Sequence, residues 1–199
     1  MAQRPKEHVR AAILEAALRE FAETGFARAT LARIATRAGT SIGNLYKYFP
    51  NKDALFAATV PDELVAEMAR LFRTRMRAFG AGAAYREASE TLLEFSLAHR
   101  DQLLFLLHHA ADTSHASFRT ALEGELVTLA IAYAKKAHPS FEPTRSRRKT
   151  LARIYRAFVG SLAVILEDEP TEAGVREATG ELTRYHLAGL KAFFGGRTK

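Results

Sequence analysis

The segment from Leu31 to Phe49 combines the residue types and the spacing that a helix-turn-helix needs. Two short helices are predicted, over residues 31–37 and 42–48, and Gly39 stands where the chain must turn sharply in a left-handed conformation. Ala35 is short enough to let the second helix approach closely. The small core between the helices would contain Ile34, Ala38, Leu45 and Tyr48. Such a turn presents the second helix as a rod that fits the major groove of DNA. The alternative is an ordinary antiparallel helix pair, which also uses alanine and glycine.

The basic charge of the chain is concentrated around the same segment. The sequence has 29 Lys and Arg against 22 Asp and Glu, a net charge of +7. Residues 1–52 hold nine basic and four acidic side chains, a net +5, and the rest of the chain is close to balanced. This asymmetry is typical of a nucleic-acid footprint, but an anionic membrane surface or simple solubility would also explain it.

Three stretches together resemble the signature of the tetracycline-repressor (TetR) family in order and spacing. They are Arg33–Gly39 (RIATRAG), Leu45–Phe49 (LYKYF) and Asn51–Leu55 (NKDAL), within a resemblance that covers roughly residues 8 to 57. One departure is Thr40, where the family commonly has valine, and its hydroxyl could cap the second helix together with Ser41. The resemblance implies a homodimeric regulator that binds a palindromic site on double-stranded DNA. It is most simply a repressor, released by a small apolar or amphipathic effector.

The resemblance also implies which side chains meet DNA. Asn44 is the candidate for base readout, because its amide can pair with adenine through two hydrogen bonds, and Lys47 could reach guanine or phosphate. Lys52 resembles the family's phosphate clamp at the start of the next helix. Tyr48 could contact the DNA backbone or belong to the core. The expected contacts are Thr30, Arg33, Thr40, Ser41, Gly43, Asn44, Tyr46, Lys47, Tyr48 and Lys52.

Helical periodicity dominates the sequence, and the alternation typical of strands is missing. We predict an all-α fold, with an N-terminal three-helix DNA-binding domain over residues 1–52 and a larger helical domain for effector binding and dimerisation over 53–199. Asn51 is placed to cap a long helix that runs from Lys52 into the seventies. Other helices are expected over residues 6–23, 84–98, 101–112, 115–137, 146–168 and 171–194.

The central helices carry more aromatic residues than a minimal bundle needs, with histidines among them. An apolar cavity that holds a few polar groups suits a small molecule, and the resemblance implies an effector there. An aromatic stripe at helical spacing could equally be core. The candidate pocket residues are Phe72, Phe95, His99, Phe105, His109, Phe118 and Tyr133.

The last two predicted helices have apolar bands wide enough for their own core and for a partner. A single helix-turn-helix buries too little surface to be selective, so such proteins usually bind paired half-sites as dimers. The resemblance supports a four-helix interface, and packing within one chain is the alternative. The expected interface residues are Tyr155, Phe158, Leu162, Ile165, Leu182, Tyr185, Gly189 and Phe193.

The alternative function is a helical enzyme or a metal-dependent binding protein that uses the central histidines. His108, Asp112 and His115 are spaced so that they could share one helical face, as metal ligands do, but Asp112-Thr113-Ser114 is more typical of a helix end. The sequence has no cysteine, no phosphate-cradling glycine loop and no nucleophile elbow. We therefore expect a non-enzyme without cofactor or metal. Without a membrane span or an export signal, we expect it in the cytoplasm.

Overall fold

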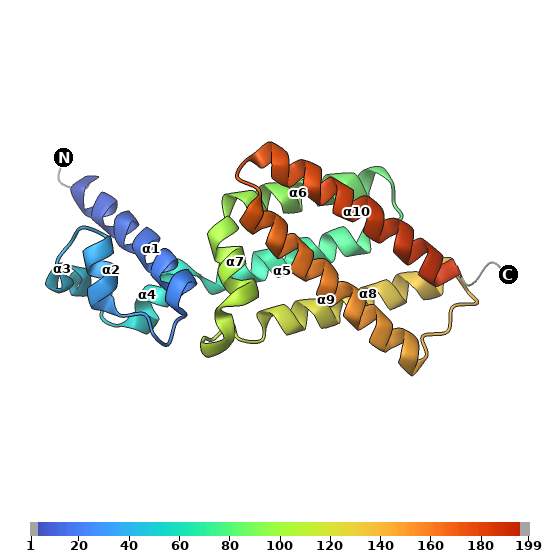
Figure 1. Cartoon of the computed structure of the whole chain (residues 1–199), viewed down its shortest axis with the longest axis horizontal. Coiled ribbons are helices and arrows are strands. Elements are labelled where there is room, and N and C mark those ends of the chain that lie inside the picture. The colour runs from blue at the N-terminus through green and yellow to red at the C-terminus, as the bar shows by residue number, and fades with distance from the viewer. Residues whose placement is uncertain (1–3, 196–199) are drawn as a thin grey trace. The chain divides into compact units, whose positions relative to one another are not determined.

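The computed structural model describes residues 4–195, with side chains from residue 6 onward, and this part of the chain is helical with no strand (Figure 1). An all-α fold is therefore confirmed. The elements are α1 (Arg4–Thr24), α2 (Leu31–Arg37), α3 (Ile42–Tyr48), α4 (Lys52–Thr59), α5 (Asp62–Arg77), α6 (Ala83–Ala98), α7 (Arg100–His108), a 3-10 turn (Ala110–Asp112), α8 (Phe118–Ala137), α9 (Arg145–Asp168) and α10 (Glu172–Gly195). None of the helices described here is both long enough and apolar enough to span a membrane.

The chain forms two compact units. The head unit contains the residues up to Glu67 together with His99–Phe118, and the bundle unit contains Met68–Ala98 together with the residues from Arg119 onward. The segment from His99 to Phe118 returns to the head unit after the first helices of the bundle unit, which no local sequence pattern announces.

The core of the head unit is built around the apolar face of α1. Ile13, Ala17 and Phe21 are fully buried there. The Phe21 ring lies 5.6 Å from the ring of Phe56 on α4 and 6.3 Å from the ring of Phe105 on α7, measured between centroids. Phe56 and Phe105 are themselves 5.5 Å apart. This aromatic cluster fixes α1, α4 and α7 to one another, and α1 in turn supports α2.

The prediction of one long helix from Lys52 into the seventies is wrong. The helix is interrupted at Val60 and Pro61, so that α4 ends at Thr59 and α5 begins at Asp62. Val60 has φ −129° and ψ 77°, outside the helical region. Proline excludes the preceding residue from helical geometry and lacks an N–H of its own, and these two effects prevail over the apolar periodicity that continues across the break.

The α7–α8 connection also differs from expectation. α7 ends at His108 and a separate 3-10 turn covers Ala110–Asp112, where a single helix over 101–112 was predicted. Thr113 is extended, and its hydroxyl accepts a hydrogen bond from the backbone N–H of His115. α8 therefore begins at Phe118 instead of residue 115.

The bundle unit contains most of α5 together with α6, α8, α9 and α10. α9 and α10 pack against each other and contribute large buried side chains to its core (Figure 1). These side chains include Leu151, Tyr155, Phe158 and Leu166 from α9, and Val175, Leu190 and Phe194 from α10.

Candidate functional site

The turn between α2 and α3 has the left-handed glycine that the sequence predicts. Gly39 has φ +65°. Its N–H donates to the carbonyl of Thr36 at 3.1 Å, and the N–H of Thr40 donates to the carbonyl of Ala35 at 3.0 Å. This pair of bonds is a Schellman motif, which satisfies the last carbonyls of α2 while it turns the chain. The bend frees α3 to point away from α2.

The contact between α2 and α3 is small and apolar, as expected. Ile34 and Leu45 are fully buried and Ala35 is 2% exposed. Ala38 and Tyr48 are half-buried, so Tyr48 belongs partly to this core and partly to the surface. The two helices are thus held by a few close apolar contacts.

The outer face of α3 is not covered by the described part of the chain. Ile42 is 44% exposed and Tyr46 is 50% exposed, and Ser41, Gly43 and Lys47 are exposed as well. Ser41 caps the helix, because its hydroxyl accepts a hydrogen bond from the N–H of Asn44 at 3.1 Å. A short, capped helix with an open polar and aromatic face has the form that enters a DNA groove.

Thr40 does not cap α3, contrary to the expectation for its hydroxyl. It accepts a hydrogen bond from the side-chain nitrogen of Asn44 at 2.9 Å. The capping role belongs to Ser41 alone, and Thr40 instead holds the amide of the residue expected to read a base.

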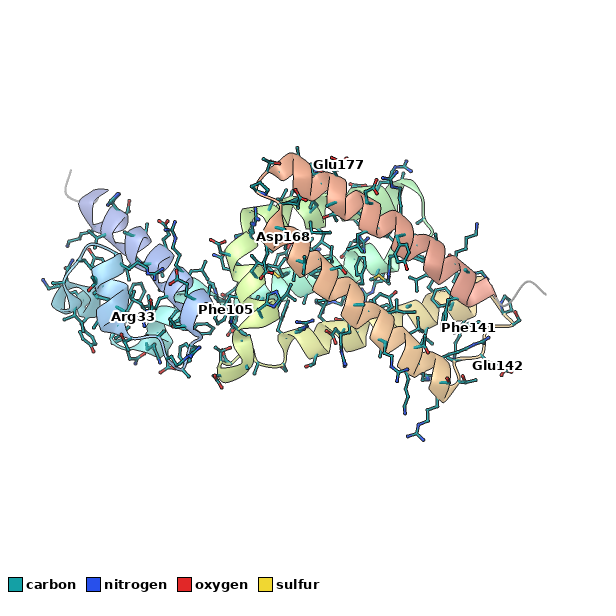
Figure 2. All side chains as sticks on the ribbon, viewed as in Figure 1. Arg33, Phe105, Phe141, Glu142, Asp168 and Glu177 are labelled. Atoms are coloured by element: carbon teal, nitrogen blue, oxygen red, sulfur yellow. The ribbon has the colours of Figure 1, made fainter. Side chains whose placement is uncertain are left out.

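Arg33 is engaged within the head unit. Its Nε lies 2.9 Å from the carboxylate of Glu20, which is 1% exposed on the apolar face of α1 (Arg33 is labelled on α2 in Figure 2). Arg37 lies 3.5 Å from the same carboxylate and makes two hydrogen bonds, of 2.6 and 2.5 Å, to Glu23. The hydrogen bond from Arg37 lowers the pKa of Glu23. The sequence analysis did not select Glu20. Its position one turn after Ala16, on the core-facing side of the first helix, was a signal, because a buried carboxylate needs a basic partner.

Lys52 is also engaged internally. Its ammonium lies 2.8 Å from the carbonyl of Phe26 and 3.2 Å from the carbonyls of Ala27 and Ala29. It also lies over the Phe26 ring, 4.6 Å from the centroid. An ammonium has three N–H donors, so this arrangement uses all of them on the loop between α1 and α2. Lys52 thus joins the start of α4 to the loop between α1 and α2 within the head unit.

The seven residues expected to form one pocket are divided between the two units. Phe105, with His99, His109 and Phe118, belongs to the head unit, whereas Phe72, Phe95 and Tyr133 belong to the bundle unit. A cavity of about 560 Å³ in the bundle unit has Tyr133 as the only one of the seven among its lining residues. The others that line it are Phe79, Gly80, Gly82, Tyr85, Arg86, Ala137, His138, Leu187, Lys191 and Phe194.

This cavity has aromatic walls and basic groups on its lining. The rings of Phe79 and Tyr133 meet edge to face, 4.4 Å apart. Gly80 has φ +83°, and a Cβ there would lie 3.0 Å from the Tyr133 ring, so glycine is required for this wall. The sequence shows the glycines of residues 80–82 only as a break between helices. Their role in shaping a cavity depends on Tyr133, more than fifty residues away.

The eight residues expected at a dimer interface separate into core and surface. Tyr155 is fully buried and Phe158 is 5% exposed within the bundle unit, so assigning them to an interface was wrong. Tyr185 is 81% exposed, Gly189 is exposed, and Leu162, Ile165, Leu182 and Phe193 are half-buried. Val164, which sequence reasoning did not select, is 49% exposed.

The histidine group considered for a metal does not converge. His115 is buried, with Nε2 3.2 Å from the carbonyl of Val60 and 3.6 Å from a carboxylate oxygen of Asp62. His108 and Asp112 are exposed. Among the residues with described positions, no group of three His, Asp or Glu side chains could hold a metal ion.

Comparison with known proteins agrees with this geometry. Residues 13–59, which span the helix-turn-helix and α4, match the model for bacterial regulatory proteins of the tetR family. The chain is 26% identical over 135 residues to the uncharacterized HTH-type transcriptional regulator YuxN of Bacillus subtilis (strain 168), a match that covers 64% of this chain and 46% of the relative.

Solved structures of similar proteins match most of the chain at low identity. They include the fatty acid degradation regulator FadR from Bacillus halodurans, at 19% identity and a TM-score of 0.45, covering 94% of this chain and 98% of that one. A TetR family transcription regulator from Marinobacter aquaeolei VT8 matches at 23% identity and a TM-score of 0.44, covering 92% and 96%. The match over the helix-turn-helix shows that residues 13–59 are similar to the tetR family of bacterial regulatory proteins.

Proposed function

We propose that this protein is a dimeric, sequence-specific DNA-binding regulator whose α3 enters the major groove. The observation that carries the proposal is the uncovered outer face of α3 beyond a left-handed Gly39 turn, with Asn44 and Lys47 on its first and last turns. The basic excess of residues 1–52 supports it, because phosphate neutralisation dominates the affinity of proteins for DNA.

We propose a role for each of the DNA-contacting residues. Asn44 reads a base, and Ser41, Gly43, Tyr46 and Lys47 contact the groove or the phosphates. Further contacts come from Thr30, whose side chain caps α2, and from the exposed part of Tyr48. Arg33, Thr40 and Lys52 contribute by positioning the reading surface, because their polar groups are bound within the head unit.

A dimer supplies the second reading helix. We propose that the outer face of α9 and α10 forms the contact, with Tyr185, Val164 and Gly189 at its centre and the half-buried Leu162, Ile165, Leu182 and Phe193 around them. An exposed tyrosine on an apolar band is typical of interface centres. Two heads would then read half-sites about 34 Å apart, or a multiple of that spacing.

We propose further that the bundle unit binds a small effector and that the effector lowers DNA affinity, as in a repressor. The cavity of about 560 Å³ has the size of a small-molecule site, with apolar walls and a few polar groups. A coupling of the usual size would reduce the affinity for DNA by about five- to 150-fold.

Selection of bound DNA from a random pool tests the proposal, followed by titration of the selected site with purified protein. The expected product is a palindromic site. Asn44→Ala should then cost about 1 to 3 kcal/mol at one base position only, whereas the control Lys47→Ala should weaken binding or change the salt dependence. A pool that shows no enrichment, or an Asn44→Ala variant that loses affinity equally on every sequence, contradicts base readout by α3.

A further inference from the structure

A buried arginine without an anionic partner lies in the bundle unit. Arg75 on α5 is 7% exposed. Its Nε donates to the hydroxyl of Ser89 at 3.1 Å and its Nη2 to the hydroxyl of Thr183 at 3.4 Å. The guanidinium also lies 4.9 Å from the ring centroid of Tyr85 and 5.9 Å from that of Phe158. All these partners are neutral, and in the described part of the chain no carboxylate forms an ion pair with Arg75.

Three further polar atoms near this guanidinium are buried and have no hydrogen-bond partner within residues 4–195. They are the hydroxyls of Tyr85 and Tyr155 and Nε2 of His186. The rings of Tyr155 and His186 lie 5.2 Å apart, and the imidazole stacks on Phe158 at 4.1 Å. Burial, with the Arg75 charge as the second cause, lowers the pKa of His186 to about 4, and burial raises the pKa of Tyr155. Both groups are therefore neutral near pH 7 and can serve as hydrogen-bond donors.

Such an arrangement is costly for a protein that has only to fold. A buried charge normally has a counter-ion, and a buried polar atom normally has a hydrogen-bond partner. One cation and three polar atoms without partners lie close together, a pattern that complements a single small anion, which could pair with the cation and accept hydrogen bonds from these groups. The alternative is that Arg75 is a structural side chain held by aromatic stacking and two hydroxyls.

The Tyr85 side chain connects this cluster to the cavity of about 560 Å³. Its ring stacks against Arg75 and also lines the cavity, where the Phe79 ring meets it edge to face at 5.9 Å. The lining residues of the cavity include Arg86 and Lys191 and contain no acidic side chain. An apolar chamber with only basic charge at its walls favours a molecule with an apolar body and a negative end.

We propose that the bundle unit binds an organic monoanion, a carboxylic acid with an aromatic or alkyl body, along the Tyr85 side chain. The carboxylate pairs with Arg75 and takes hydrogen bonds from Tyr155 and His186, and the apolar body occupies the cavity. The inference rests on the proposed function only in calling this molecule the effector, because its binding is measurable without DNA.

The test compares acids with neutral molecules of the same shape. Phenylbutyrate, naphthylacetate and decanoate, each beside its primary amide, are titrated into the full-length protein by calorimetry and by thermal shift. The acids should bind the unmodified protein about tenfold or more tightly than the amides, since hydrogen bonds to charged groups are the stronger ones. Arg75→Gln should abolish that preference, while Arg77→Gln, an exposed arginine on the same helix, should retain it.

A second variant separates ligand binding from folding. Arg75→Met replaces the guanidinium by an apolar chain of similar reach, and without ligand its melting temperature should equal or exceed that of the unmodified protein. A lower melting temperature would identify Arg75 as structural and overturn the proposal. Absence of acid binding across the panel, equal binding of acids and amides, or an acid preference that survives Arg75→Gln overturns it as well. Loss of DNA binding with acid binding intact would contradict only the proposed function.

Discussion

The side-chain nitrogen of Asn44 and the hydroxyl of Thr40 are joined by a hydrogen bond of 2.9 Å across the start of α3. The bond leaves the side-chain oxygen and one N–H of Asn44 for another partner. Those two groups are the ones that an asparagine uses in a bidentate contact to adenine. Thr40 therefore orients the amide that we expect to read a base.

Thr40→Val should loosen this amide without changing the shape of the turn. We expect discrimination at the base position read by Asn44 to fall about three- to tenfold, the value of one hydrogen bond. The salt dependence of binding should stay the same, because no phosphate contact is lost. Fluorescence anisotropy with the selected site and its single-base variants measures both quantities. Thr36→Val is the matched control, since its hydroxyl bonds only to the carbonyl of Ala32. Equal effects from both variants would remove Thr40 from this role.

Lys52→Met should destabilise the head unit in the absence of DNA. The variant leaves the carbonyls of Phe26, Ala27 and Ala29 without their shared donor, and hydrogen bonds to charged groups are worth about 1.5 to 3 kcal/mol. We expect a loss of about 2 to 3 kcal/mol in urea unfolding. Lys47→Met, on the exposed face of α3, should weaken DNA binding with unchanged stability. If Lys52→Met instead changes only the salt slope of DNA binding, Lys52 is the phosphate clamp that the family resemblance implies.

The loss of stability caused by substitutions at Gly39 should come from backbone strain and not from crowding. A Cβ at this position meets no atom within 4 Å, so the cost of a side chain comes from φ +65° alone. Gly39→Ala should cost about 1 to 2 kcal/mol, and Gly39→Asn should cost less because asparagine tolerates the left-handed region better. Chemical denaturation monitored by circular dichroism gives the order. Equal losses for alanine and asparagine would mean that strain is not the cause.

The helix-turn-helix could be predicted closely because its signals are local. Caps at Thr30 and Ser41 and the left-handed Gly39 act within a few residues, and α2 and α3 begin and end where the sequence predicts. Pro61 is just as local, but the apolar periodicity on both sides of it concealed the break. The buried Glu20 also had a signal, its place on the core face of α1.

The bundle unit could be predicted only as a set of helices. Periodicity shows which face of a helix is apolar, but it does not show whether a neighbour in the same chain covers that face. Tyr155 and Tyr185 illustrate this, because both lie on the apolar bands of the last two helices, yet one is fully buried and the other is 81% exposed. For the same reason, the pocket candidates Phe105 and Tyr133 had equivalent patterns and belong to different units.

The buried His186 should make stability fall in mild acid. Its folded-state pKa of about 4 lies below the ordinary 6.5, so the folded state favours the neutral ring. The stabilisation is therefore complete above about pH 6.5 and is lost as the pH falls toward about 4. Between about pH 7 and pH 5 we expect a loss of about 2 kcal/mol. Arg75, Tyr155 and Phe158 lie near the ring, and none of them titrates in this interval.

Urea unfolding at several pH values measures this effect, with His186→Gln as the comparison. The glutamine variant carries no titrating group, so its stability should change less between the same pH values. Parallel curves for the two proteins would show that the acid sensitivity comes from other side chains.

Tyr185→Glu should separate the proposed dimer into folded monomers. Tyr185 is 81% exposed on α10, so the substitution removes little contact within the chain, but it places a charge at the centre of the proposed interface. Burying a carboxylate without a partner costs far more than the loss of one apolar contact. Analytical ultracentrifugation should therefore show a dissociation constant raised at least about a hundredfold, an effect of roughly 2.7 kcal/mol. Ala173→Glu, at a neutral and exposed position near the start of α10, controls for added negative charge alone. A Tyr185→Glu protein that remains dimeric would place the interface on another face of the bundle unit.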